Sequence, residues 1–166
     1  MNPRRLAVFG VPVVVLLLIA AVYVFSGDPV KAAPPAVDKD AERMCEALHD
    51  ELPDSVAGLE RRDTEPSSRL TAAWGDPAVV LRCGVPRPAE MNNPKAPGAK
   101  VSDVDWMLEG PEDGAYRSTT VYREVYVELT LPTKYGDVSA LMDLAAAIKK
   151  TIPSTFEDSD EHAHHE

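Results

Sequence analysis

The chain has 166 residues with 27 acidic and 17 basic side chains, which give a formal net charge of −10. This length suits one ordinary domain of about 100–150 residues, and the acidic balance argues against a nucleic-acid partner, whose surface would be basic. Two cysteines are too few for a Cys-rich zinc site or for a network of several disulfides.

An apolar run without a single charge comes first along the chain, and we predict a transmembrane helix over residues 6–25. At about 1.5 Å per residue, a helix of that length crosses the hydrocarbon core of a bilayer, about 30 Å thick. Two arginines precede the run, so the positive-inside rule places residues 1–5 in the cytoplasm, residues 6–25 against membrane lipid and the rest outside the plasma membrane. The alternative is a signal peptide cleaved after Ala32, which would release a secreted protein.

The remainder divides into a linker, a domain and a tail. Residues 26–37 are rich in proline and alanine, which predicts a short stiff stalk. Residues 157–166 hold five acidic side chains and three histidines, which predicts a solvated, disordered tail. Weak binding of Zn or Cu by these histidines is a further hypothesis, although their spacing lacks a scaffold. One extracytoplasmic domain over residues 38–156 lies between linker and tail.

The domain is predicted to begin with a helix. Asp38 can cap it, and apolar side chains recur at helical spacing from Met44 to Leu52, where Pro53 ends the pattern. The next segments are less regular. We expect a short strand over residues 55–62, a polar loop over 64–68, a turn at 74–77 and a β-branched strand over 78–85.

A long loop and a second group of strands follow. Residues 86–100 contain four prolines and no periodicity, which predicts a loop of unusual length. Residues 101–108 form a weak predicted strand and 111–114 a turn, whereas the alternation over 121–131 predicts the clearest strand of the chain. A last helix over residues 137–152 is predicted to start at an aspartate and to end before a proline.

This order of elements predicts an α+β fold. Strands that lie between two helices along the chain favour a small two-layer α/β sandwich with a mainly antiparallel sheet. The complete prediction is therefore a single N-terminal transmembrane helix followed by this sandwich. A swapped or all-β arrangement is the alternative.

The two cysteines are predicted to form a disulfide. Cys45 lies on the apolar side of the first helix, and Cys83 shares a strand face with Val79, Leu81 and Val85. Both thiols then point into one core, and an exported chain meets an oxidising environment. Closing a loop of roughly 40 residues stabilises the fold by about 4 kcal/mol in the chain-entropy model. A reactive thiol pair, for which no C-x-x-C motif is present, and two buried free thiols are the alternatives.

Several short motifs together resemble an actinobacterial family of membrane-anchored proteins, the domain-of-unknown-function family 3515. The signature W-G-D-P…L-R-C-G carries the resemblance, within a set that comprises AAWGDPAVVLRCGV over residues 72–85, Leu52-Pro53, Arg61-Arg62, Trp106 and the segment from Arg123 to Glu128. The resemblance covers the whole exported domain. It implies a location and a domain boundary and carries no mechanism.

One cluster is the best candidate for binding. Trp74 can act as a stacking platform, with Asp76 in the following turn and Arg82 as a contact for an anion or a partner. The structural alternative is a tight turn whose Trp packs at the edge of the core, with Arg82 paired to an acid. Glu124 and Glu128 lie about 13 Å apart along the predicted strand at 3.3 Å per residue, too far for a typical pair of catalytic carboxylates.

The sequence contains no motif for known catalysis. It has no P-loop, G-x-G-x-x-G, H-E-x-x-H or G-x-S-x-G pattern, and His49 is expected at the surface of the first helix. We therefore expect no catalytic residue, no cofactor and no resident metal. The favoured hypothesis is a non-enzymatic cell-envelope module that binds another envelope protein or a wall precursor through the region 74–82 or the loop 86–100. An envelope hydrolase that uses a carboxylate such as Glu124 or Asp76 is the alternative.

Overall fold

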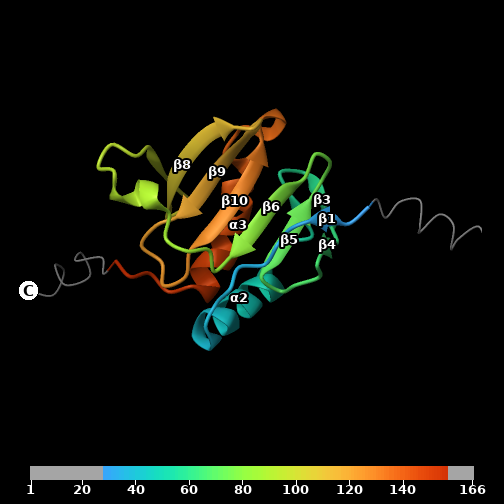
Figure 1. Ribbon diagram of the computed structural model, residues 1–166, viewed down its shortest axis with the longest axis horizontal. Coiled ribbons are helices and arrows are strands. Elements are labelled where there is room, and N and C mark those ends of the chain that lie inside the picture. Colours follow the sequence, from blue (N-terminus) through green and yellow to red (C-terminus); the bar gives the residue numbers. More distant parts are fainter. Residues whose placement is uncertain (1–27, 157–166) are drawn as a thin grey trace, which may run out of the picture.

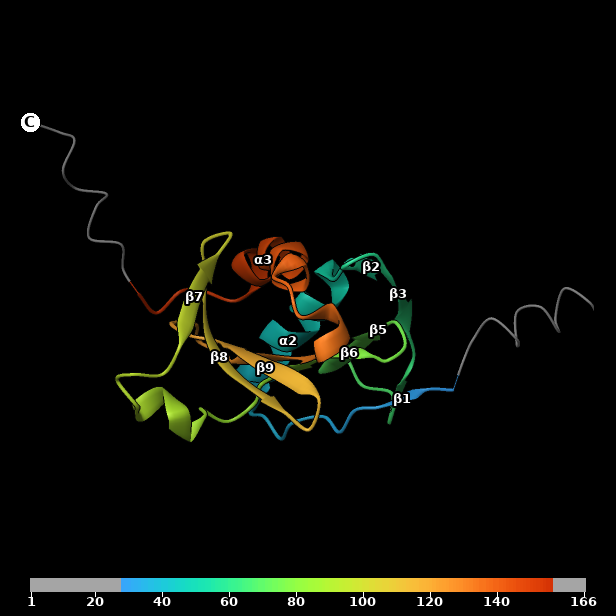
Figure 2. The same cartoon turned by 90° about the horizontal axis from the view of Figure 1, so that it is seen from above.

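The computed structural model describes residues 28–156. In it, eight strands form a sheet in which every neighbouring pair is antiparallel, and two helices cover one face of that sheet (Figure 1, Figure 2). From one edge to the other, the strands are β2 (Ser55–Val56), β3 (Leu59–Arg62), β5 (Thr71–Trp74), β6 (Val79–Cys83), β10 (Val127–Pro132), β9 (Ala115–Thr120), β8 (Val104–Glu112) and β7 (Gly98–Val101). The short strands β1 (Val30–Lys31) and β4 (Thr64–Glu65) form a separate parallel pair.

Both predicted helices are present, and an aspartate caps each start. Helix α2 (Lys39–Glu51) has Asp38 as its N-cap, whose carboxylate accepts two backbone N–H groups of the first turn at 3.0 and 2.9 Å. Helix α3 (Ser139–Thr151) follows Asp137, whose carboxylate accepts the Ser139 N–H at 2.9 Å. These acceptors satisfy N–H groups that the first turn of a helix leaves without partners.

The core lies between the helices and the sheet. Helix α3 contributes the buried residues Leu141, Leu144 and Ile148. On the central strands, every second side chain is buried there: Val79, Leu81 and Cys83 on β6, and Val127, Leu129 and Leu131 on β10. The neighbours between them, Arg82 and Glu128, point to the opposite face. This alternation sets the register, because a shift by one residue would bury both charges.

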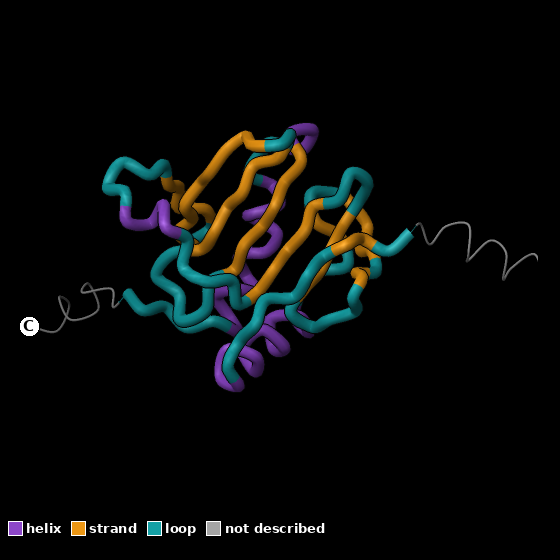
Figure 3. The backbone as a smooth tube through the Cα atoms, in the orientation of Figure 1, coloured by secondary structure: helices purple, strands orange, loops and turns teal. Residues whose placement is uncertain are grey.

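Residues 28–37, which we call the strap, cross the sheet face opposite to the helices (Figure 2, Figure 3). The strap contains β1, which pairs with β4, and its Ala32 is buried. The Arg82 Nε–H donates to the Ala33 carbonyl at 3.1 Å. The described part of the predicted stalk thus packs on the sheet, because its backbone carbonyls find donors there and its small alanines fit close to the strands.

The strand predicted over residues 121–131 is wrong in its first half. Strand β9 ends at Thr120 and β10 begins at Val127, so residues 121–126 form the connection between the two strands. Tyr122 has a φ of 56°, which is outside the extended region. Its carbonyl accepts the Thr155 N–H at 2.9 Å, so the middle of the connection pairs with the segment after α3, while the Val121 N–H still donates to Asp105 of β8 at 2.8 Å.

Four segments contain more regular structure than predicted. The polar loop 64–68 contributes β4, and no strand was expected where β5 lies. The proline-rich loop 86–100 contains a 3-10 helix, η1 (Ala89–Asn92), and its last residues belong to β7. A second 3-10 helix, η2 (Thr133–Tyr135), follows β10. These short or polar elements lack the long apolar alternation that identifies a strand.

The predicted fold class is wrong as it was stated. The described chain is a mostly antiparallel sheet of eight strands with two helices on one face. Among residues 28–156, neither helix combines the length and the apolar character that a bilayer crossing requires. The predicted transmembrane segment, residues 6–25, lies outside the described residues, and nothing in the structure supports it.

Candidate functional site

Cys45 and Cys83 form a disulfide, as their placement predicted. The bond joins the middle of α2 to the end of β6 with 5.6 Å between the two Cα atoms. Each cysteine is 1% exposed. The bond therefore fixes the helix to the sheet inside the core, at a site that reagents in solution do not reach.

Trp74, the predicted stacking platform, is fully buried at 0% exposure. Its indole N–H donates to the Pro53 carbonyl at 3.1 Å, and the guanidinium carbon of Arg61 lies 5.0 Å from the ring centroid. Asp76 is exposed in the following turn, where its backbone carbonyl accepts the Tyr135 hydroxyl at 3.1 Å. The Trp thus packs in the core, as in the structural alternative, and offers no face to a ligand.

Arg82 points away from Trp74, to the strap side of the sheet. One of its terminal nitrogens lies 3.3 Å from a carboxylate oxygen of Glu128, and the other oxygen of that carboxylate lies 3.7 Å from Arg117 Nε. Because the strap accepts the Arg82 Nε–H, this guanidinium already has internal partners. The structure does not bring Trp74, Asp76 and Arg82 to one surface.

The carboxylates considered for hydrolysis are also apart. Glu124 is exposed in the connection between β9 and β10, where its backbone N–H donates to the Pro153 carbonyl at 3.1 Å. The Glu128 side chain is 13% exposed and forms ion pairs with Arg82 and Arg117. These surroundings give Glu128 a role in pairing charges across the sheet, where Arg117 lies between it and a second carboxylate, that of Glu109, 3.9 Å from the arginine.

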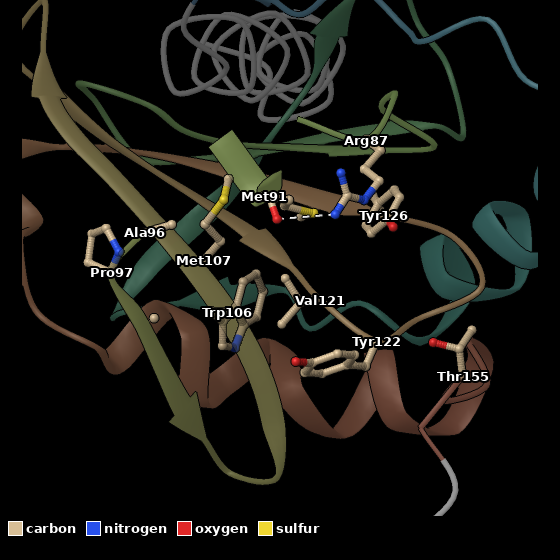
Figure 4. Close-up of a pocket in the computed structure, with 11 residues that line it drawn as sticks. Arg87, Met91, Ala96, Pro97, Trp106, Met107, Val121, Tyr122, Tyr126 and Thr155 are labelled. Carbon is tan, nitrogen blue, oxygen red and sulfur yellow. Dashed lines mark hydrogen bonds between the residues drawn. The ribbon is translucent and has the colours of Figure 1, made fainter. Parts of the chain in front are cut away.

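A cavity of about 380 Å³ lies under the loop 86–97 and is a candidate binding site (Figure 4). The loop forms one wall, β8 a second, and the connection 121–126 with the segment after α3 a third. Its lining is mostly aromatic and apolar and comprises Arg87, Met91, Ala96, Pro97, Gly98, Trp106, Met107, Val121, Tyr122, Tyr126 and Thr155. A volume of this size accommodates a small ligand.

Trp106 gives the cavity its most specific feature. The residue is 1% exposed, and within residues 28–156 its indole N–H has no hydrogen-bond partner. In Figure 4 the indole nitrogen lies on the side of the ring that faces Tyr122. A buried N–H group without an acceptor costs about 1–3 kcal/mol, so Trp106 keeps an unused donor beside this cavity, at a nitrogen that solvent does not reach.

Arg87 supplies a cation at the loop side of the cavity. Its guanidinium donates to the Asn92 side-chain oxygen at 2.6 Å and to the Met91 carbonyl at 3.2 Å, and Figure 4 shows the second bond. Within the described residues it forms no ion pair. The loop therefore fixes the orientation of the Arg87 guanidinium, whose positive charge is not paired with a carboxylate of the described residues.

Two tyrosines complete the rim. Tyr126 lies beside Arg87 in Figure 4, and Tyr122 is 54% exposed with its ring 5.3 Å from that of Phe156. No histidine, cysteine or carboxylate lines this cavity, and within residues 28–156 no cluster of such residues could hold a metal ion. The lining residues supply stacking faces and hydrogen-bond donors, which suit binding.

Sequence reasoning found one wall of this cavity and missed the others. The loop 86–100 was one of the two predicted binding regions. Trp106 was noted only for the family resemblance, and the two tyrosines lay within the strand predicted over residues 121–131. Aromatic side chains that alternate with glutamates on a polar face were the available signal, because large exposed aromatics often mark a contact surface.

The comparisons with known proteins identify a family and add no function. The family model described as "Protein of unknown function (DUF3515)" matches residues 7–156. No curated protein and no solved structure matches the chain. Since the matched residues make up most of the sequence, this chain belongs to the DUF3515 family.

Proposed function

We propose that this protein is a non-enzymatic binding domain of the cell envelope, which holds a wall precursor in the cavity under the loop 86–97. The unused indole N–H of Trp106 in the wall of that cavity carries the proposal. A ligand that accepts this hydrogen bond removes the cost of a buried donor, so the site gains affinity from a group already in place.

The disulfide supports a location outside the cytoplasm. Disulfides form and persist in oxidising compartments, whereas cytoplasmic thiols stay reduced. The Cys45–Cys83 bond is buried in the core and joins two of its main elements. The fold therefore depends on a bond that an exported chain can keep.

The chemistry of the cavity favours a precursor that combines a sugar with a short peptide. Tyrosine and tryptophan faces stack on the apolar face of a sugar ring. An acetamido carbonyl can accept the Trp106 N–H, and a peptide carboxylate can pair with the Arg87 guanidinium in a bidentate manner. A wall precursor built from an N-acetylated amino sugar and a peptide offers all three groups, which makes it a better match than the flat surface of a partner protein.

The two tryptophans allow a direct test on the full-length chain. Nuclear magnetic resonance of the ¹⁵N-labelled protein follows the two indole N–H signals during titration with N-acetylmuramyl dipeptide. We expect a saturable shift of the Trp106 signal. The Trp74 signal is an internal control, because that N–H already donates to Pro53. A Trp106 signal that stays unchanged would contradict the proposal.

Two variants separate the roles of the donor and the cation. Trp106→Phe retains the ring and removes the N–H, and Arg87→Gln removes the charge beside the cavity. Each should weaken binding of the dipeptide by about tenfold, which corresponds to about 1.4 kcal/mol. Arg43→Gln is the matched control, because Arg43 is an exposed residue of α2 that pairs with Asp40. Equal affinity in all three variants would show that the ligand binds elsewhere.

A further inference from the structure

A second cavity, of about 320 Å³, lies on another part of the molecule and is lined by basic and hydroxyl side chains. It is bounded by α2, by the end of β3 and by the loop between β4 and β5, and Figure 1 shows these three strands at the same end of the sheet. Arg61, Arg62 and Arg69 line it together with His49. In a chain of net charge −10, such a gathering of cations is unusual.

Two of these arginines have no carboxylate partner. Within residues 28–156, neither Arg61 nor Arg62 forms an ion pair at 4.0 Å or less. Arg61 is instead 3.3 Å from His49 Nε2 and stacks on Trp74. These neighbours orient its guanidinium in a half-buried position, where the Asp54 carboxylate acts on its charge without forming an ion pair.

Arg62 is held in a similar manner by backbone groups. One of its terminal nitrogens donates to the Gly75 carbonyl at 3.1 Å, and the other donates to the carbonyl of Asp28 in the strap. Arg69, at the outer lip, differs because it lies 2.6 Å from a carboxylate oxygen of Asp50. The cavity therefore has two oriented arginines outside any ion pair of the described residues, one held from the helix side of β3 and one from the strap side, and a third that is already paired.

The electrostatic effect of these arginines reaches His49. Burial lowers the pKa of this imidazole, and the positive charges of Arg61 and Arg69 lower it further, against a smaller opposing effect of Asp50. Burial also lowers the pKa of Arg61, against an opposing effect of the Asp54 carboxylate. The direction at His49 shows that the positive charges of the two arginines act on this cavity, although one carboxylate, Asp63, is part of the lining.

Hydroxyl groups complete the donor set. Ser67 and Ser68 line the cavity from the loop after β4, and the Thr64 and Thr71 hydroxyl oxygens lie 3.2 Å apart on its strand side. Guanidinium forks together with hydroxyl donors match the tetrahedral oxygens of a phosphate better than the planar oxygens of a carboxylate, because they approach from several directions.

We propose that this cavity, lined by Arg61, Arg62 and Ser67, is a binding site for a phosphoryl group. The group can belong to a soluble phosphate ester or to a phospholipid headgroup, and the recognition chemistry is the same for both. The site shares no lining residue with the cavity under the loop 86–97, so the two proposals stand independently.

The test follows His49 of the full-length protein by nuclear magnetic resonance as a function of pH. Inorganic phosphate should raise the pKa of His49 in a saturable manner, because a bound anion offsets the charges of the nearby arginines. Sodium chloride at equal ionic strength is the control and should leave it unchanged. A phosphate response no larger than the chloride response, together with no response to the vesicles described next, would overturn the proposal.

A second arm distinguishes the two sources of the group. Vesicles of phosphatidylglycerol and vesicles of a galactolipid, which carries no phosphate, are compared by the same His49 readout. A response to phosphatidylglycerol alone identifies a lipid headgroup, and a response to inorganic phosphate alone identifies a soluble ester. Both results support the phosphoryl site, whereas a response to the galactolipid as large as the response to phosphatidylglycerol would contradict it.

Variants complete the experiment. Arg62→Gln and Arg61→Lys should each lower the affinity for phosphate by about tenfold, since each removes a guanidinium fork. The lysine retains a cation against Trp74, which protects the fold. Arg43→Gln should leave the affinity unchanged. Trp106→Phe should retain the phosphate response, which separates a failure here from a failure of the proposed wall-precursor site. Equal affinities in the wild type and in both arginine variants would overturn the assignment.

Discussion

Gly84 and Val37 contact each other so closely that no side chain fits at position 84. A Cβ atom built on Gly84 would lie 2.2 Å from Val37 Cγ1, and the φ of Gly84 is +89°. The glycine directly follows Cys83, so this contact holds the strap against the end of β6 that also carries the disulfide.

This contact predicts a large effect of Gly84→Ala. The free energy of unfolding should fall by about 2–4 kcal/mol, because backbone strain at positive φ adds to the clash with the strap. Gly114→Ala is the matched control, since Gly114 has a φ of +78° but nothing within 4 Å of a built Cβ. It should cost only the strain, about 1–2 kcal/mol. Urea unfolding measures both values, and equal losses would contradict the contact.

Removal of the disulfide should destabilise the protein strongly. Replacing Cys45 and Cys83 by Ala together should lower the free energy of unfolding by about 4 kcal/mol, because the unfolded chain loses its loop constraint. Unfolding of the oxidised wild type and of the double variant gives the difference. Mass spectrometry of the native protein after thiol alkylation should find no free thiol, and two alkylated cysteines would refute the bond.

Glu128 links positive charges across the middle of the sheet. Glu128→Gln should lower the free energy of unfolding by about 1–3 kcal/mol, because Arg82 and Arg117 lose the carboxylate between them and this site is only 13% exposed. The control is Asp40→Asn, which removes an ion pair whose side chains are 79% and 76% exposed. It should change stability by about 0.5 kcal/mol or less. Chemical denaturation measures the free energy of unfolding of both variants. Similar small decreases in the two would show that the ion pairs of Glu128 contribute little to stability.

His49 makes stability depend on pH. Its pKa in the folded protein is below the ordinary value of 6.5, mainly because of burial and then because of Arg61 and Arg69. As the pH falls from 7 through 6.5, the unfolded chain binds the proton first, so the free energy of unfolding decreases until the folded pKa is passed.

The matched variant His49→Gln should lose less stability over the same pH range than the wild type. Histidines 162, 164 and 165 are outside the described residues and are present in both proteins, so they do not account for a difference between them. Denaturation at several pH values between 5 and 7.5 provides the comparison. Parallel curves for the two proteins would show that His49 titrates normally.

Local signals predicted the helices well. Asp38 and Asp137 were recognised as N-terminal signals, and Pro53 and Pro153 as stops, because capping and helix termination depend on a few consecutive residues. The disulfide was also accessible, because both cysteines share apolar faces of clear elements. The strand limits around residues 121–126 could not be predicted, since the alternation of apolar and polar residues continues across the connection. The pairing of Tyr122 with Thr155 involves a distant segment.

The candidate sites required the tertiary structure for a different reason. Trp74 and Trp106 look alike in the sequence, and only packing decides that one indole donates to Pro53 while the other has no partner. In the same way, the charge of Arg82 is paired with that of Glu128, which lies 46 positions away, while Arg61 forms no ion pair within residues 28–156.

Local patterns and short motifs were enough to predict the two helices, the cysteine pair, the loop up to residue 97 and the family. The eight-stranded sheet, the position of the strap and the lining of both cavities could be seen only in the folded chain. These depend on which distant segments meet, and the free energy of a contact or of an unpaired group is set by the neighbours that folding brings to it.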